Sequence, residues 1–198
     1  MMTNATTGHD VAAATIAALI VQAGALWALG RPLLCACGEF KLWEGDAASP
    51  GLSQQLTDWY SFTHVIHGVL FYFLLWLAAP GLSVGQRFMI ALALEVGWEI
   101  LENTPFAIRH YRKQPPAQDY AGDSIVNSLA DTLAMALGFV LAWRLPALAV
   151  IAISVLLEVG VALNIRDNFT LNVLSFIYPF DFIRRWQNGA PSAPICGR

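Results

Sequence analysis

Charged residues are scarce in this chain of 198 residues: aspartate, glutamate, lysine and arginine together make up 13% of it. A soluble domain usually carries about 25%. Because 57% of the residues are hydrophobic, charge cannot cover a water-exposed surface of this size. The scarcity of charge therefore excludes an ordinary soluble domain and predicts a protein whose surface is largely covered by lipid.

Basic residues are also few, with 11 lysines and arginines against 14 acidic residues and a net charge of −3. A nucleic-acid binder needs a basic face, so this function class is excluded. The chain has no internal repeat and no H-E-x-x-H signature of a zinc protease,. Any enzymatic activity must therefore come from a less familiar arrangement of residues.

Cysteine occurs three times, as a C-x-C pair at Cys35 and Cys37 and as Cys196 near the C-terminus. A C-x-C pair can hold a metal, form a disulfide or consist of two ordinary thiols. So short a motif specifies little, and ordinary thiols are the first expectation. The cysteines leave the redox compartment open.

Five apolar runs of about 20 residues have the length needed to cross the hydrocarbon core of a bilayer. They cover residues 11–30, 60–79, 87–108, 123–143 and 146–165. A further apolar stretch, residues 169–183, is broken by Asn172, Pro179 and Asp181, which indicates an interfacial or re-entrant segment. The sequence predicts an all-α membrane protein with one bundle of about five transmembrane helices and a C-terminal interfacial or re-entrant segment.

Lysines and arginines gather in the loops after the first and third spans and in the C-terminal tail, whereas the opposite side holds only Arg87 and Arg144. The positive-inside rule places these loops in the cytoplasm and the N-terminus outside. Arginines that serve a functional site would produce the same bias, so the orientation stays open.

Ionisable side chains inside the spans are the most informative feature, because each costs about 2.5–3.5 kcal/mol to insert. The polar residues of the second, third and fourth spans are His64 and His67; Glu95, Glu99, Glu102 and Asn103; and Asp123, Asn127 and Asp131. In each span they recur every three or four residues and therefore share one helix face. Three such faces predict one interior site near one leaflet, with Asp123 also expected as the N-cap of the fourth span.

The five acids of the third and fourth spans have no lysine or arginine to face within the spans. Clustered carboxylates in a low dielectric must be protonated, paired or bound to a cation. Histidines and carboxylates together suit a divalent transition metal such as zinc, iron or manganese. The expected metal ligands are His64, His67 and Asp123, and the expected catalytic carboxylates are Glu99, Glu102 and Asp131.

Positive charge follows the third span at Arg109 and Arg112. It is explained equally by the positive-inside bias and contact with anionic lipid headgroups, or by capture of a phosphate or carboxylate on a lipid-linked substrate. On the second interpretation Arg109, Arg112, Asn103 and Asn127 are the expected substrate-binding residues.

Four stretches, DWYSFTHVIHG (58–68), WEILEN (98–103), YAGDSIVNSLADT (120–132) and RDNFTLN (166–172), resemble an uncharacterised family of alphaproteobacterial multi-pass inner-membrane proteins. The resemblance covers nearly the whole chain and implies the bacterial inner (plasma) membrane, but no activity. More distantly, an early histidine, a late glutamate in the next span and the D-x-x-x-N of Asp123–Asn127 are similar to VanZ-like proteins, which are tied to envelope stress and glycopeptide resistance.

Three functions are consistent with these features. The first is a metal-dependent hydrolase or transferase acting on a lipid or envelope substrate. The second is an accessory protein whose polar network only holds its helices together. The third is a small proton-coupled transporter, which with five spans and no repeat would need to oligomerise. Membrane lipids are the expected partners in all three, and the oligomeric state stays open.

Overall fold

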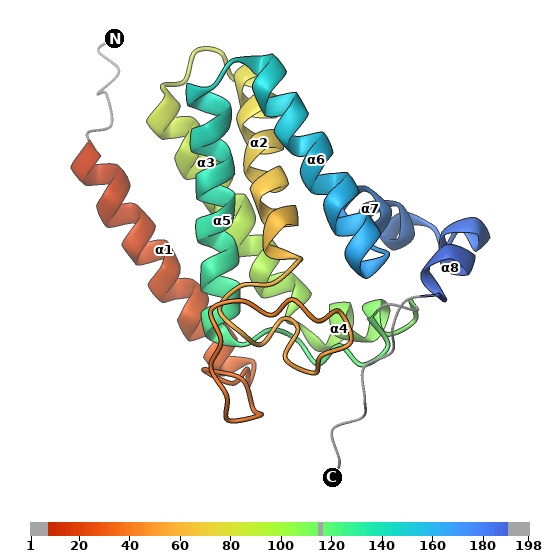
Figure 1. Ribbon diagram of the computed structural model, residues 1–198. Coiled ribbons are helices and arrows are strands. Elements are labelled where there is room, and N and C mark those ends of the chain that lie inside the picture. The colour runs from red at the N-terminus through yellow and green to blue at the C-terminus, as the bar shows by residue number, and fades with distance from the viewer. Residues whose placement is uncertain (1–7, 115–116, 190–198) are drawn as a thin grey trace.

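The fold was described from a computed structural model, which covers residues 8–114 and 117–189 (Figure 1). In these residues eight helices follow one another: α1 (Gly8–Ala28), α2 (Ser61–Ala78), α3 (Val84–Glu102), α4 (Pro105–Tyr111), α5 (Ile125–Arg144), α6 (Ala147–Ile165), α7 (Phe169–Ile177) and α8 (Asp181–Gln187). Extended pairing in the same ranges is limited to one bridge between Glu44 and Asp58. The predicted all-α class is therefore confirmed.

Four helices in the described part of the chain are long and apolar enough to cross a membrane, namely α1, α2, α5 and α6. Helix α3 has 19 residues but carries Arg87 and three glutamates, and it is not among them. The expectation of about five spans is thus supported for four helices by length and composition. Helices α7 and α8, of 9 and 7 residues, are too short to cross a bilayer.

The third predicted span, residues 87–108, is broken in the structure. Helix α3 ends at Glu102, and the short helix α4 starts at Pro105 with the Thr104 hydroxyl accepting a hydrogen bond from the Ala107 N–H. Proline disfavours helical geometry in the residue before it but fits the first turn of a helix. The break turns Asn103 away from a continuous helix and into the protein, where it is fully buried.

Helices α2 and α5 lie side by side at the centre of the bundle (Figure 1). They touch through two glycines: a Cβ atom at Gly68 would lie 1.9 Å from the Met135 carbonyl oxygen, and one at Gly138 would lie 1.9 Å from the Val65 carbonyl oxygen. Small residues let helix backbones approach this closely. Gly68 and Gly138 therefore permit the close packing of α2 against α5.

A hydrophobic core lies between α3 and α5, toward the ends of these helices that are remote from the long loops. Its buried members are Ala91, Leu92, Val96, Met135 and Phe139. The acidic residues of α3 and α5 lie nearer the loop ends. Polar and apolar layers are therefore stacked along the same helices, and the apolar layer fixes the spacing of the polar one.

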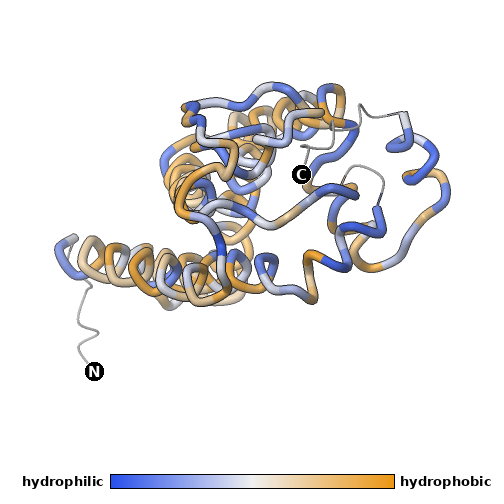
Figure 2. Tube along the Cα trace, turned by 90° about the horizontal axis from the view of Figure 1, so that it is seen from below, coloured by the Kyte–Doolittle hydropathy of each residue, from blue (hydrophilic) through white to orange (hydrophobic). Residues whose placement is uncertain are grey.

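Helix α1 leans away from the bundle toward its N-terminus and meets α5 near its other end (Figure 1). Gln22 makes this contact: its Nε2 donates to the Ser128 hydroxyl at 2.8 Å, and its Oε1 accepts from Thr132 at 2.9 Å. Viewed from below, the loops at this end of the molecule are mainly hydrophilic, whereas the helices carry hydrophobic stretches (Figure 2). The polar end of the bundle and its long loops coincide.

The long loop between α1 and α2 folds against the start of α5. The carbonyl oxygens of Pro32 and Leu33 accept hydrogen bonds from Ile125 and Val126, two of the N–H groups that a helix start leaves unpaired. In the same loop Cys35 and Cys37 form a disulfide, so the expectation of ordinary thiols is wrong. Cys196 lies outside the described residues.

Candidate functional site

His64 of α2 lies between two glutamates of α3. Its Nδ1 is 2.6 Å from Glu95 Oε1, and Nδ1 of His67, one turn further along, is 3.0 Å from Glu95 Oε2. A carboxylate can only accept, so each imidazole donates its Nδ1 proton to Glu95. This hydrogen bond orients the His64 ring and leaves its Nε2 lone pair available on the other side.

Two carboxylate oxygens near His64 have no hydrogen-bond partner among the residues that the structure describes. Glu99 Oε1 lies 3.2 Å from His64 Nδ1, but the single proton on that nitrogen is directed at Glu95, so Glu99 Oε1 is left unpaired. Asp131 Oδ1 is also unpaired, and its Oδ2 lies 4.0 Å from His64 Nε2. Glu99 and Asp131 are 0% and 4% exposed, and a buried acceptor without a partner is costly.

A second acidic group lies beside the first, where α3 ends and α5 begins. Asn103 and Asp123 bind each other twice, through Asn103 Nδ2 to Asp123 Oδ2 at 2.6 Å and through the Asp123 N–H to Asn103 Oδ1 at 2.8 Å. The Tyr120 hydroxyl donates to Asp123 Oδ1 at 3.0 Å and lies 3.4 Å from Glu102 Oε1. Burial raises the pKa of Asp123 above its ordinary value, which favours a proton shared with a neighbouring carboxylate.

Asp123 is not the N-cap of α5, contrary to the prediction. The cap is Ser124, whose hydroxyl accepts from the Asn127 N–H at 3.1 Å. The turn before it needs Gly122, whose φ is +93°. Residues with a side chain rarely adopt this backbone conformation. This turn directs Asp123 toward Asn103 and Tyr120 instead of toward the helix end, so Asp123 is available to the site.

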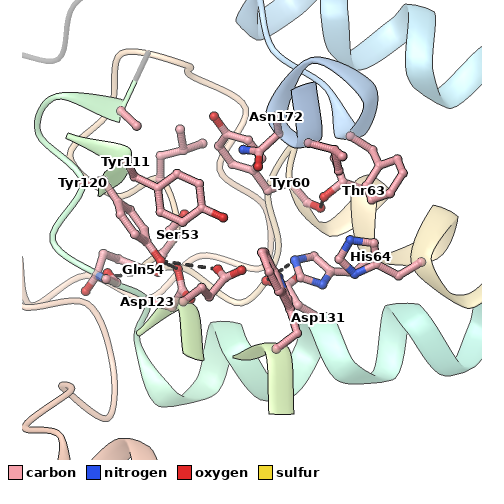
Figure 3. A pocket seen from close by; sticks show the side chains of 18 of the residues that line it. Ser53, Gln54, Tyr60, Thr63, His64, Tyr111, Tyr120, Asp123, Asp131 and Asn172 are labelled. Atoms are coloured by element: carbon pink, nitrogen blue, oxygen red, sulfur yellow. Dashed lines mark hydrogen bonds and ion pairs between the residues drawn. The ribbon is translucent and has the colours of Figure 1, made fainter. Parts of the chain in front are cut away.

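The acidic groups border a cavity of about 540 Å³ (Figure 3). Figure 3 shows His64 and Asp131 close together on one side of it and Tyr120 and Asp123 on the other. Its polar end is also lined by Ser53, Gln54, Tyr60, Thr63, Glu102, Tyr111 and Asn172. The volume is within the range of about 300–1,000 Å³ that is usual for small-molecule sites.

Three overlapping sets of side chains have ligand atoms within 4.8 Å of one another: His64, His67 and Glu95; His64, Glu99 and Asp131; and Glu99, Glu102 and Asp123. The first set is already paired internally through Glu95. The second comes from three helices, is buried throughout, and contains both unpaired carboxylate oxygens. Because its unpaired carboxylate oxygens are free to act as ligands, this set is the best suited of the three to bind a cation.

The structure brings most of the predicted site residues together. His64, His67, Glu99, Glu102, Asp123 and Asp131 belong to the three ligand sets, Asn103 holds Asp123, and Asn127 is buried with an unpaired Nδ2. Arg109 and Arg112 are exposed and do not line the cavity. The Nε of Arg112 donates to the Tyr120 carbonyl oxygen at 2.6 Å, which positions the loop that carries Tyr120.

Sequence analysis overlooked several residues that shape the site. Ser128 donates its hydroxyl to Glu99 Oε2 and is itself bound by Gln22. Gln22 could have been noticed as a polar residue in an apolar span, whereas a lone serine carries no such signal. Tyr60 and Tyr120 line the cavity, but their positions depend on loop conformations that periodicity does not reveal.

Helix α7 covers the cavity and is held in place by Glu158 of α6. The Glu158 carboxylate accepts from the Phe169 N–H at 3.1 Å and from the Thr170 N–H at 3.2 Å, both at the positive end of α7. Glu158 therefore has a structural role, because it satisfies two N–H groups that the start of α7 leaves unpaired. The C-terminal apolar stretch thus becomes a short helix packed beside the site, with Phe169 5.0 Å from the His67 ring.

Asp167 joins the start of α7 to the rest of the molecule. Its Oδ2 accepts from the Tyr60 hydroxyl at 3.2 Å, and its Oδ1 accepts from Gln187 at 3.2 Å. Burial raises the pKa of this carboxyl to about 6 from 3.8. The folded protein therefore holds the Asp167 proton more tightly than the unfolded chain does, so its contribution to stability is complete below about pH 4 and is lost as the pH rises through 6.

We expect the protein in detergent to melt at a higher temperature at pH 5 than at pH 7.5, and Asp167→Asn to reduce this difference. Between pH 5 and pH 7.5 the raised pKa of Asp167 corresponds to on the order of 1 kcal/mol of pH-dependent stability, because part of its contribution is already lost between pH 4 and pH 5. Burial also raises the pKa of Asp58 to about 6, so the variant should remove only part of the slope. Asp46→Asn, at an exposed loop position, is the control. Equal slopes in wild type and Asp167→Asn would contradict the prediction.

With the site defined, comparison with known proteins shows where the chain belongs. Residues 26–189 match the family described as "Protein of unknown function (DUF2585)". The chain is a member of this family. The match contains every residue of the three ligand sets, so the site described above lies within the family's own region.

Relatives of this family member occur in several alphaproteobacteria, all under the description UPF0314 protein. A protein of Brucella anthropi is 45% identical over 88% of both chains, and one of Rhizobium meliloti is 47% identical over 89% of both. A Paracoccus denitrificans protein is 48% identical over 85% of this chain and 89% of its own. No solved structure matches. The resemblance to an uncharacterised alphaproteobacterial family is thus confirmed, and the VanZ-like resemblance stays a prediction.

Proposed function

We propose that this protein is a membrane-embedded, metal-dependent hydrolase or transferase that acts on a lipid or lipid-linked envelope substrate. One observation carries the proposal: His64, Glu99 and Asp131 converge from three helices beside a cavity, and two of their buried carboxylate oxygens lack a hydrogen-bond partner in residues 8–114 and 117–189. A purely structural network would satisfy these oxygens, because unpaired buried acceptors destabilise the fold.

The arrangement around His64 supports metal binding. Glu95 accepts the Nδ1 proton, which is the second-sphere contact that fixes a metal-binding imidazole,. The separation of 4.0 Å between His64 Nε2 and Asp131 Oδ2 is too long for a hydrogen bond,. Two ligand bonds of about 2.1 Å each can span it. A divalent ion bound there would supply an activated water at neutral pH.

The roles that we propose for the individual residues differ from those predicted from the sequence. We assign His64, Glu99 and Asp131 to the metal, and His67 to the pair with Glu95. Glu102 and Asp123 lie against the cavity with the Tyr120 hydroxyl between them. Two carboxyl groups in this position can hold and release one proton, so we assign them the role of general base or acid.

The inner membrane of the bacterium is the location that fits these features. Four helices have the length and apolarity of membrane spans, and the relatives come from alphaproteobacteria. Polar groups inside such a bundle face a cavity or an interior site when they are functional. A lipid substrate could reach this site without leaving the bilayer.

Elemental analysis of the purified protein in detergent tests the proposal. We expect about one equivalent of a transition metal per chain in the wild type, as for sites built from histidine and carboxylates, and its loss in His64→Ala. His9→Ala is the matched control, because His9 lies exposed at the start of α1.

Each outcome of this measurement has a clear meaning. Metal retained in His64→Ala at the wild-type level would place any metal elsewhere in the molecule. Absence of metal from wild type, even after incubation with zinc, iron or manganese, would overturn the proposal and favour a structural polar network. Circular dichroism of both variants checks that the helices persist.

A further inference from the structure

The cavity continues beyond the acidic groups into an apolar groove along α2. Its lining positions on α2 follow the helical repeat from Thr63 to Leu74 and include His64, His67 and Leu70. These positions share one face of the helix, and 11 residues of helix extend about 17 Å. The cavity is therefore elongated along the helices. Its polar end lies at the loops, and its apolar end lies further along α2, away from the loops.

The apolar end of the groove opens sideways, away from the bundle core. Leu74 of α2 and Leu94 of α3 line it, and they are 59% and 51% exposed. Exposed leucines on long apolar helices face hydrocarbon when the protein is in a bilayer. Trp98 of α3 and Val173 of α7 also line the cavity. A molecule in the groove could thus contact both the bilayer and the acidic groups.

Charge restricts what can occupy the polar end. Among the cavity-lining residues that the structure describes, four are acidic, none is lysine or arginine, and the histidines are His64 and His67. The acidic members are Glu102, Asp119, Asp123 and Asp131. A phosphate headgroup would be repelled here unless a metal ion offset these charges. An uncharged head rich in hydroxyl groups would find carboxylate and tyrosine partners.

We propose that the groove binds a single long hydrocarbon chain of a membrane lipid, which enters sideways between α2 and α3 and brings an uncharged polar head to the acidic end. This inference names the substrate class for the proposed hydrolase or transferase and in that respect rests on it. Chain binding itself requires only the groove. It departs from the expected anionic substrate, because Arg109 and Arg112 lie outside the cavity lining.

Native mass spectrometry of the full-length protein in detergent tests this inference, with monooleoylglycerol as the long-chain probe and monooctanoylglycerol as the short-chain comparison. We expect one equivalent of the long-chain probe to bind, and the short-chain probe to bind at least about tenfold more weakly, since its shorter chain buries less hydrocarbon in the groove. Leu70→Trp fills the groove and should weaken binding of monooleoylglycerol by about tenfold or more. Leu163→Trp is the control, because Leu163 of α6 is 75% exposed and does not line the cavity.

The same titration separates this inference from the metal proposal. Binding of monooleoylglycerol should persist after chelation, whereas oleoyl lysophosphatidic acid, with its anionic head, should bind only to metal-loaded protein. Leu94→Trp on the facing helix replaces Leu70→Trp if that variant does not fold. Equal binding to the groove variant and to Leu163→Trp, or no preference for the longer chain, would overturn the inference. Loss of metal from the wild type would leave it standing.

Discussion

Gly68→Ala should prevent α2 and α5 from reaching their native separation, and we expect it to be the most destabilising single-methyl change in the central helix pair. The added Cβ would lie 1.9 Å from the Met135 carbonyl oxygen and 2.6 Å from the Phe139 backbone nitrogen. Both are backbone atoms in the middle of α5, so no side-chain rotation relieves the clash. The two helices must move apart, and His64 and Asp131 move with them.

The expected loss is roughly 3 kcal/mol or more, at the upper end of the range for overpacked cores. In a protein of this size that lowers the melting temperature by roughly 6–12 °C. Melting in detergent, followed by circular dichroism, measures the effect. Gly138→Ala should behave alike, because its Cβ would lie 1.9 Å from the Val65 carbonyl oxygen.

Two other helical glycines provide matched controls. Gly97 of α3 and Gly160 of α6 have no atom within 4 Å of an added Cβ. Alanine is the better helix former by about 1 kcal/mol, so both substitutions should leave stability unchanged or raise it. A Gly68→Ala protein as stable as the Gly160→Ala protein would show that α2 and α5 do not pack as described.

Glu99→Gln should be more stable than wild type without metal and less stable than wild type with metal. Without metal, the variant should be the more stable protein by about 1–2 kcal/mol, because an unpaired buried carboxylate is replaced by a neutral amide,. With metal at about 100 times its dissociation constant, wild type gains about 2.7 kcal/mol through binding. The variant lacks one ligand and gains much less.

Thermal melts with added zinc or manganese and with chelator measure this reversal. Wild type should lose roughly 5–10 °C on chelation, and Glu99→Gln should barely respond. Glu39→Gln is the control, since the Glu39 side chain is 70% exposed in the first loop, and it should follow wild type in both conditions. A Glu99→Gln protein that is less stable than wild type in chelator would indicate a structural role for this carboxylate.

The polar faces of the helices could be predicted because helix periodicity is a local property. Glu95 and Glu99 are four residues apart, as are Asn127 and Asp131, and such spacing places side chains on one face in any helix. Insertion into lipid is costly for these groups, so the faces had to turn inward. Their convergence with His64 followed from those two facts.

Other parts of the site depend on contacts between segments distant in the chain. The end of α3 at Glu102 and the turn at Gly122 direct Asn103 and Asp123 toward each other across 20 residues of sequence. Ser128 binds Glu99 from a neighbouring helix. Neither contact leaves a periodic pattern in the sequence. The contact with Asn103 could therefore not be foreseen, and Asp123 was predicted to be the N-cap of α5 in place of Ser124.

The sequence by itself determined that the chain is helical, that several of its helices are long and apolar enough to cross a membrane, four of the expected five by the structure's bounds, and that histidine and acidic residues share helix faces that turn inward. These conclusions rest on composition and on the 3.6-residue helical repeat, which act within single helices. Only the tertiary structure decided which carboxylate oxygens are left unpaired, that the arginines lie outside the cavity, and that the groove opens sideways past Leu74. These depend on the distance between α2 and α5 and on the loop turns, which are set by packing between residues far apart in the chain.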